Sequence, residues 1–183
     1  MRLKVKRFIM GPLDTNCYLV YDEGTSEAII IDPGDTGEDL KEVLEEIKRK
    51  ALRPIMLISS HGHFDHVCGV PELKRELKIP FALHREDADR EFMKTFSEGL
   101  CDFEPETPDL LLEEGKLDIL EGHEVEVIHT PGHSPGSVVL VFDSSLAFTG
   151  DTLFKGTIGR TDLPRSSPKA MRSSITKIFG RLE

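Results

Sequence analysis

The pattern H-x-H-x-D-H over residues 61–66 constrains this chain more than any other feature. In extended backbone, side chains at i, i+2 and i+4 point the same way, and the side chain at i+5 points the opposite way. His61, His63 and Asp65 can therefore line one side of a loop, while His66 reaches round from the other side. One cation cannot comfortably take all four groups from so short a loop. The spacing therefore predicts two adjacent metal ions.

The sequence around this loop alternates between strand-like and helix-like segments. Strands are predicted at 17–21, 28–31, 54–58, 79–83, 117–120, 124–129, 137–142 and 146–148. Helices are predicted at 38–50, 71–77, 86–96 and 168–179. Residues 99–116 contain Pro and Gly and could form a mobile loop over a site. The histidine loop follows the strand at 54–58, at the end where α/β folds place ligand chemistry.

The bulk properties suit one globular domain over residues 1–183. The net charge of −10 argues against a nucleic-acid partner. No apolar run approaches the ~20 residues of a membrane span, and the charged N-terminus lacks the apolar stretch of a signal peptide. The odd number of cysteines predicts free thiols at Cys17, Cys68 and Cys101, and a cytoplasmic location.

Two later segments carry further candidate ligands. Residues 130–137 read T-P-G-H-S-P-G-S, so that His133 stands in a rigid loop just before a strand. Residues 149–151 read T-G-D, which puts Asp151 at the end of an apolar strand. In isolation, each would be read as an ordinary turn residue exposed to water. With the histidine loop, they complete a plausible pair of metal sites.

These motifs together resemble the metallo-β-lactamase superfamily. The resemblance extends over residues 15–18, 31–34 and 159–164 and covers nearly the whole chain. Within the superfamily, the sequence is most similar to single-domain hydrolases of the glyoxalase II type. The resemblance implies an α+β fold, a four-layer αββα sandwich with the metal site at one edge of its paired sheets.

The resemblance also implies a ligand set. His61, His63 and His133 would bind the first metal, and Asp65 and His66 the second, with Asp151 bridging the two. The cofactors would be zinc or iron, with manganese possible, because imidazole nitrogen and carboxylate oxygen suit these ions alike.

One feature departs from the family pattern. The family supplies a last histidine to the second metal after the final strand, and this sequence ends at Glu183 without that segment. We therefore expect a truncated form, with a fold that lacks its C-terminal end. Such a form is expected to bind one metal firmly and the second weakly or not at all.

The expected chemistry is hydrolysis by attack of a metal-bound hydroxide. A thioester of the S-lactoylglutathione type is a reasonable small-molecule substrate, because a thiolate leaves readily. Asp151 and Asp65 are the candidate catalytic residues; Asp151 would orient the hydroxide, and Asp65 would act first as a ligand. Arg160 is a candidate for binding an anionic substrate group. An ion pair with Asp162 is an equally good interpretation of Arg160.

Two alternatives remain open at this point. A persulfide dioxygenase with one iron would need only His61, His133 and Asp151, all of which are present. A metal-binding module without turnover is the other. The stretch Phe64-Asp65-His66-Val67 and the Leu163-Pro164 pair after residues 159–162 favour the hydrolases. The oligomeric state cannot be predicted, and no membrane partner is expected.

Overall fold

The computed structural model describes residues 3–181. Its first sheet has six strands in sequence order: β1 (Leu3–Met10), β2 (Thr15–Asp22), β3 (Glu27–Ile31), β4 (Arg53–Ile58), β5 (Phe81–His84) and β6 (Leu110–Leu112). The first three strands pair antiparallel, and β3 to β6 pair in parallel. The central strand β3 is buried along its whole length, which explains its continuous run of apolar residues.

The second sheet is antiparallel and has the strand order β10-β9-β8-β7. Its strands are β7 (Gly115–Leu117), β8 (Val125–His129), β9 (Val138–Phe142) and β10 (Leu146–Phe148). A short hairpin follows, made of β11 (Leu153–Phe154) and β12 (Thr157–Ile158). This hairpin leads toward the last helix.

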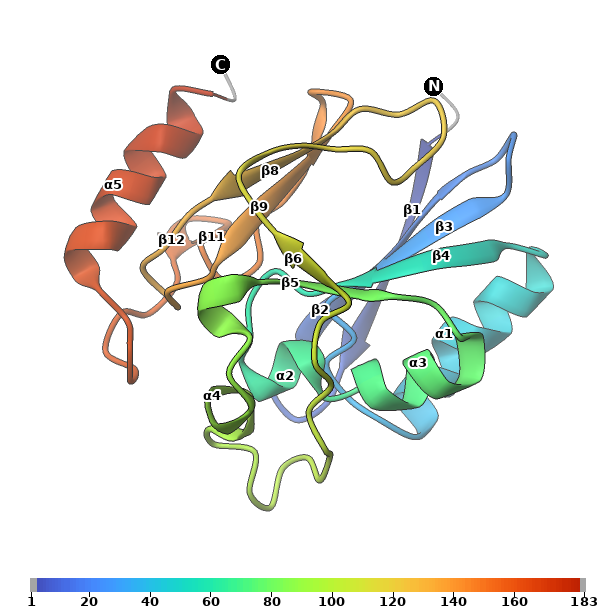
Figure 1. Cartoon of the computed structure of the whole chain (residues 1–183), viewed down its shortest axis with the longest axis horizontal. Helices are drawn as coiled ribbons and strands as arrows, with labels where there is room; N and C mark the ends of the chain where they lie inside the picture. The colour runs from blue at the N-terminus through green and yellow to red at the C-terminus, as the bar shows by residue number, and fades with distance from the viewer. Residues whose placement is uncertain (1–2, 182–183) are drawn as a thin grey trace.

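Helices cover the outer face of each sheet (Figure 1). On the first sheet lie α1 (Glu38–Arg49), α2 (Phe64–Val67) and α3 (Val70–Leu77), and α5 (Pro168–Phe179) lies on the second. A single 3-10 turn (Arg85–Asp87) and the short α4 (Arg90–Lys94) follow β5. The arrangement is helices, sheet, sheet, helix. The predicted four-layer αββα sandwich is confirmed.

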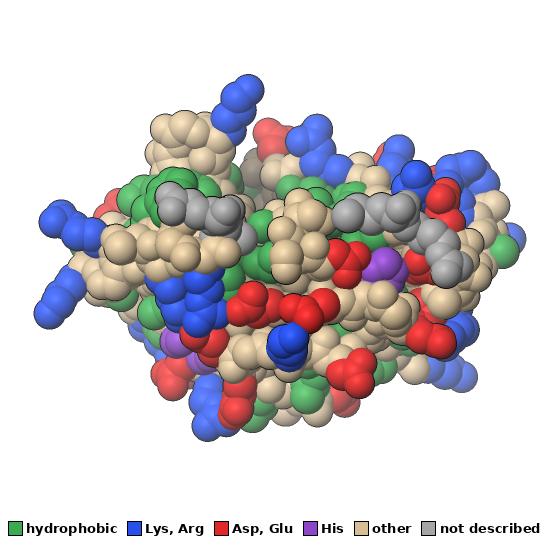
Figure 2. Space-filling model, turned by 90° about the horizontal axis from the view of Figure 1, so that it is seen from above, with side chains coloured by type: hydrophobic (Ala, Val, Ile, Leu, Met, Phe, Trp, Pro, Cys, Tyr) green, Lys and Arg blue, Asp and Glu red, His purple; other side chains and the backbone are tan. Residues whose placement is uncertain are grey.

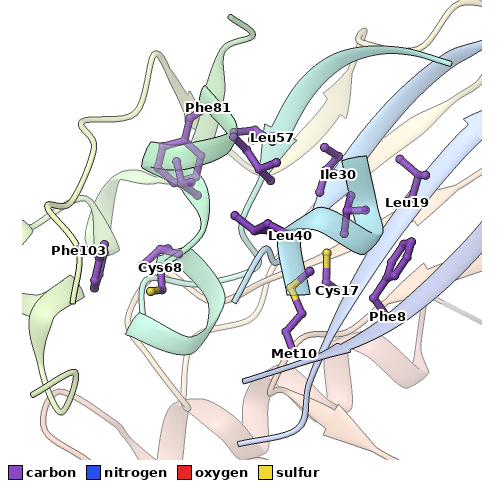
Figure 3. Close-up of a cluster of buried hydrophobic side chains, with 14 of the residues drawn as sticks. Phe8, Met10, Cys17, Leu19, Ile30, Leu40, Leu57, Cys68, Phe81 and Phe103 are labelled. Atoms are coloured by element: carbon purple, nitrogen blue, oxygen red, sulfur yellow. The ribbon is translucent and has the colours of Figure 1, made fainter. Parts of the chain in front are cut away.

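Three apolar clusters hold these layers together. Between the sheets, Ile29 and Ile31 of β3 share a cluster with Val127 and Leu140 of the second sheet. Under α1, Leu40 lies at the centre of the cluster in Figure 3, near Cys17 and Ile30. Ile178 of α5 packs on the outer face of the second sheet in a third, smaller cluster. Alternate residues of each strand therefore face different layers, as the pleat requires.

Several predicted boundaries differ from the structure. The strand β1 was not predicted, because its alternating lysines and apolar residues read as a charged terminus. The predicted helix at 86–96 is two short pieces, since Asp89 caps α4 through the amides of Glu91 and Phe92. The strand predicted at 117–120 lies at 115–117, and the irregular stretch 99–116 contains β6.

The prediction of three free thiols is wrong for two of the cysteines. Cys68, directly after α2, is bonded to Cys101, 33 residues further along the chain. Both are buried, and Figure 3 shows Cys68 beside Phe103. Cys17 is buried as a free thiol, and burial raises its pKa well above the ordinary value. The wide spacing of the cysteines in the sequence gave no indication of this disulfide bond, because only the folded chain brings Cys68 and Cys101 together.

The far end of the sandwich carries a histidine bridge between the two sheets. His123 Nδ1 lies 2.7 Å from Asp143 Oδ2, and its Nε2 lies 3.0 Å from Asp22 Oδ2. Burial acts to lower the pKa of His123, but the hydrogen bonds with Asp143 and Asp22 raise it overall. Asp22 ends β2 and Asp143 follows β9, so an imidazolium here ties the two sheets together.

Charges of both signs are spread over the surface. On the face shown in Figure 2, Lys and Arg side chains are interspersed with Asp and Glu. Among residues 3–181, no helix is both long and apolar enough to cross a membrane.

Candidate metal centre

Loops at one edge of the two sheets carry the predicted ligands. His61, His63 and His66 follow β4, and His66 lies within α2. His133 stands between β8 and β9 of the second sheet, and Asp151 follows β10. The two sheets therefore present their loops to one another, and residues 70 positions apart in sequence come into contact.

The three imidazoles predicted for the first metal converge. His61, His63 and His133 each offer a nitrogen, and these nitrogens all lie within 4.8 Å of one another. The His63 Nδ1 and His133 Nε2 atoms are 2.9 Å apart. All three side chains are buried. Nitrogens around one zinc ion at ~2.0–2.1 Å lie roughly 3.3 Å apart, so this cluster has the dimensions of a metal site.

The backbone around the centre fixes which nitrogens face inward. His133 Nδ1 donates to the carbonyl oxygen of Arg160 at 2.9 Å, which leaves His133 Nε2 directed at the cluster. Such a hydrogen bond to the second ring nitrogen orients metal-binding histidines in general. Gly159 packs directly on the backbone of Asp151, where a Cβ would overlap the carbonyl oxygen of Asp151. Sequence reasoning missed this role of the 159–160 backbone.

The carboxylate of Asp151 lies between two histidines. Its Oδ1 is 3.3 Å from His66 Nε2, and its Oδ2 is 3.4 Å from His133 Nε2. One oxygen thus faces each of the two predicted metal positions. His61, His66 and Asp151 also form a second group whose ligand atoms lie within 4.8 Å of one another. This arrangement supports the prediction that Asp151 bridges two metal ions.

Asp65 lies at the edge of the second group. Its Oδ2 accepts a hydrogen bond from Thr15 Oγ1 at 2.8 Å and lies 3.5 Å from His66 Nε2. Behind His66, Asp32 Oδ2 is 3.2 Å from Nδ1, while Asp32 Oδ1 accepts the backbone amide of Ser60 at 2.6 Å. Asp32 therefore orients both His66 and the start of the ligand loop. The sequence marked Asp32 only as part of the stretch 31–34 that resembles the family, and did not predict this role.

Burial and neighbouring charges set the protonation of the centre. Burial, followed by the nearby imidazoles, holds the pKa of His61 well below its ordinary value and lowers the pKa of His63 to about 4. Burial also acts on His66, but the carboxylates of Asp32, Asp65 and Asp151 raise its pKa well above the ordinary value. The pKa of Asp151 is lowered, because the surrounding imidazoles outweigh its burial. His61 and His63 are thus neutral at pH 7, which is the form that binds metals.

Three buried ring nitrogens in this centre make no hydrogen bond among the described residues: His61 Nε2, His66 Nδ1 and His66 Nε2. Buried polar atoms are normally paired, so such a concentration is unusual. His61 Nδ1 lies 3.2 Å from the hydroxyl of Ser60, and its unpaired Nε2 can therefore act as a ligand. His61 Nε2 and His66 Nε2, with the carboxylate of Asp151, fit zinc or iron, while His66 Nδ1 faces Asp32.

Asp87 connects the two ligand loops and was not predicted. Its buried carboxylate accepts the amide of Gly62 at 2.9 Å and the amide of Gly136 at 2.7 Å. It also accepts the Ser134 hydroxyl at 2.6 Å. Burial raises the pKa of Asp87, although all three hydrogen bonds oppose that shift. Through these bonds, one side chain fixes the spacing between the loop of His61 and the loop of His133.

Arg160 is at the rim of the centre. Its guanidinium makes two bonds with Asp162, from Nε at 2.7 Å and from Nη2 at 2.8 Å. This is the ion pair that the sequence offered as the second interpretation. The side chain also lines the cavity that contains His63 and Asp151.

Comparison with known proteins agrees with this geometry. Residues 10–181 match the family described as the metallo-beta-lactamase superfamily. The chain is similar to the hydroxyacylglutathione hydrolase GloC of Haemophilus influenzae, with 36% identity over 172 residues, or 90% of this chain and 79% of the relative.

Two solved structures are similar over almost the whole chain. The B3 metallo-beta-lactamase BLEG-1 has a TM-score of 0.87 at 33% identity, covering 98% of this chain and 87% of that one. TTHA1623, in a di-iron-bound form, has a TM-score of 0.83 at 34% identity, and the match covers 96% of this chain and 86% of that one. The buried histidine cluster lies at the edge of the same sandwich in this protein. The chain belongs to the metallo-beta-lactamase superfamily.

Proposed function

We propose that this protein is a metal-dependent hydrolase of thioesters. The observation that carries the proposal is the cluster of buried imidazole nitrogens with Asp151 between them. A bound divalent ion lowers the pKa of water to about 7 and polarises a carbonyl group. The similarity to a hydroxyacylglutathione hydrolase supports thioesters as the substrate class.

Separate residues of the chain would bind the metal ions, orient the attacking water and bind the substrate. His61, His63 and His133 would hold the first ion, and His66 and Asp65 would contribute to a second position. Asp151, whose two oxygens lie near His66 and His133, would orient the attacking water. The leaving thiolate needs little protonation, because a thiol has a pKa near about 8.5. Arg160, whose exposed partner Asp162 is easily exchanged, can bind a carboxylate of the substrate.

Removal of metal is expected to abolish hydrolysis of S-lactoylglutathione. Treatment with a chelator should reduce the rate to background, and zinc, iron or manganese should restore it. His133→Ala should lose both metal and activity, because it removes one of three convergent nitrogens. The measurement is the release of free thiol, with metal content determined on the same samples.

His123→Gln is the matched control, since His123 belongs to the bridge at the other end of the sandwich. It should keep its metal and its rate. Hydrolysis that persists in a metal-free sample would contradict the proposal. So would oxygen consumption with glutathione persulfide in a protein that leaves every thioester intact.

A further inference from the structure

A cavity of about 400 Å³ opens beside the metal centre. Its lining combines four polar residues of the centre, His63, Asp65, His133 and Asp151, with an apolar wall of Leu13, Phe64, Phe96, Leu100 and Leu163. Thr95 and Arg160 complete the lining. The cavity falls within the size range of small-molecule sites, roughly 300–1,000 Å³. A substrate whose reacting carbonyl lies at the metal centre must therefore place an adjacent group against this apolar wall.

Three residues of the wall are unusually exposed for their type. Leu13, Phe96 and Leu100 have exposed fractions of 53%, 55% and 45%, whereas most large apolar side chains in residues 3–181 are buried. They come from the turn after β1 and from the segment after α4, yet they line one cavity. Exposed apolar side chains that gather around a polar centre are typical of a binding site rather than of a plain surface.

Phe96 is held at the cavity in a costly backbone conformation. Its φ angle is 65°, in the left-handed region, which costs a residue with a side chain roughly 1–2 kcal/mol. The segment is fixed on both sides, since the amide of Ser97 donates to Lys94 and the amide of Cys101 donates to Ser97. Cys101 is in turn bonded to Cys68, next to α2. Strain of this kind is found at functional sites, where the surrounding structure maintains it.

A second cavity on the other side of Asp65 and Asp151 has a different character. It measures about 480 Å³ and is lined mainly by polar side chains, among them Arg7, Asn16 and Lys155. The two cavities share Leu13, Asp65 and Asp151, so the metal centre lies between them. A thioester consists of an acyl group and a thiol carrier. One cavity would surround its part of the substrate with apolar side chains, and the other with polar side chains.

We propose that the apolar cavity binds the acyl group, so that the enzyme prefers thioesters of apolar acids to those of hydroxy acids. This inference rests on the proposed thioesterase function. The polar cavity then receives the body of the thiol carrier, and Arg160, at the rim of the centre, stays available to a carboxylate of that carrier. A hydroxyl group on an acyl chain that lies against Leu13, Phe96 and Leu100 would meet apolar side chains, whereas an alkyl group there buries apolar surface.

The test compares two substrates of nearly equal shape. S-isobutyrylglutathione differs from S-lactoylglutathione by a methyl group in place of a hydroxyl, and the carrier is the same. The metal-loaded enzyme is assayed with both, and with S-butyryl and S-hexanoyl thioesters of glutathione. The kcat/KM should favour isobutyryl over lactoyl, and it should rise roughly fourfold for each methylene group added from butyryl to hexanoyl.

The variant Phe96→Asn separates binding from the intrinsic reactivity of the esters. Asn tolerates a left-handed backbone and removes the aromatic wall. The isobutyryl-to-lactoyl ratio should fall about tenfold in this variant, because a buried aromatic contact is lost. Phe179→Asn is the control, since Phe179 is an equally exposed phenylalanine on α5. Its ratio should equal that of the wild type.

The outcomes distinguish the two proposals. Equal ratios in the wild type and in Phe96→Asn would overturn the acyl preference and leave the thioesterase function intact. A wild type that favours the lactoyl ester in the same assay would do the same. A metal-loaded enzyme that hydrolyses none of the four thioesters would overturn the proposed function together with the preference.

Discussion

Replacing Asp151 with alanine should lower the rate of thioester hydrolysis by more than about 100-fold. Removing a residue that only orients a metal ligand typically costs about 10- to 100-fold, and Asp151 is expected to do more than that. The variant loses the carboxylate that lies between His66 and His133. The fold should survive, because Asp151 stands in a loop after β10 rather than in an apolar cluster. The measurement is kcat at saturating substrate, with metal content and thermal unfolding determined on the same protein.

Asp118→Ala is the matched control for this variant, since Asp118 is an exposed aspartate on the loop after β7. It should retain the wild-type rate. If Asp151→Ala turned over at the wild-type rate with wild-type metal content, Asp151 would have no part in the chemistry.

Asp87→Ala is expected to have the second largest effect, although Asp87 is not among the predicted ligands. Its removal leaves two backbone amides and the hydroxyl of Ser134 without their acceptor. Each buried donor left unpaired costs about 1–3 kcal/mol, so the free energy of unfolding should fall by about 3 kcal/mol or more. Metal affinity should fall by about 10- to 100-fold, because the two ligand loops lose their common anchor.

Urea unfolding of the metal-free protein and a separate metal titration measure these two effects. Asp87→Asn should be intermediate in both, because it keeps one acceptor oxygen. Asp118→Ala again serves as the control. An Asp87→Ala variant with the stability and the metal affinity of the wild type would show that the two loops are positioned independently of Asp87.

Local sequence patterns predicted the candidate ligands of the centre better than the residues that hold the ligand loops in position. His61, His63 and Asp65 occur in one short pattern that follows an apolar strand, and His133 and Asp151 follow recognisable turn signals. These positions could be predicted because strand ends place their loops at a common edge of the sandwich. Their roles as ligands remain predictions, which the convergence of the side chains supports.

The residues that hold the site in position act through contacts between distant parts of the chain. Asp87 lies 25 residues from Gly62 and 49 from Gly136, and no local pattern marks it. The pairing of Cys68 with Cys101 is of the same kind. The wall around Phe96 was also missed, because exposure of an apolar side chain is visible only in the folded chain. The spacing of apolar residues predicts one helix or strand at a time, so contacts between distant elements could not be predicted from it.

Anomalous X-ray diffraction from a crystal grown with zinc tests the central claim most directly. The account predicts an ion at ~2.0–2.1 Å from His61 Nε2, His63 Nδ1 and His133 Nε2, with Asp151 beside it. His133→Ala, crystallised under the same conditions, should lose that peak or bind far less zinc. A zinc ion bound elsewhere, with the three histidines remaining unligated, would contradict the account.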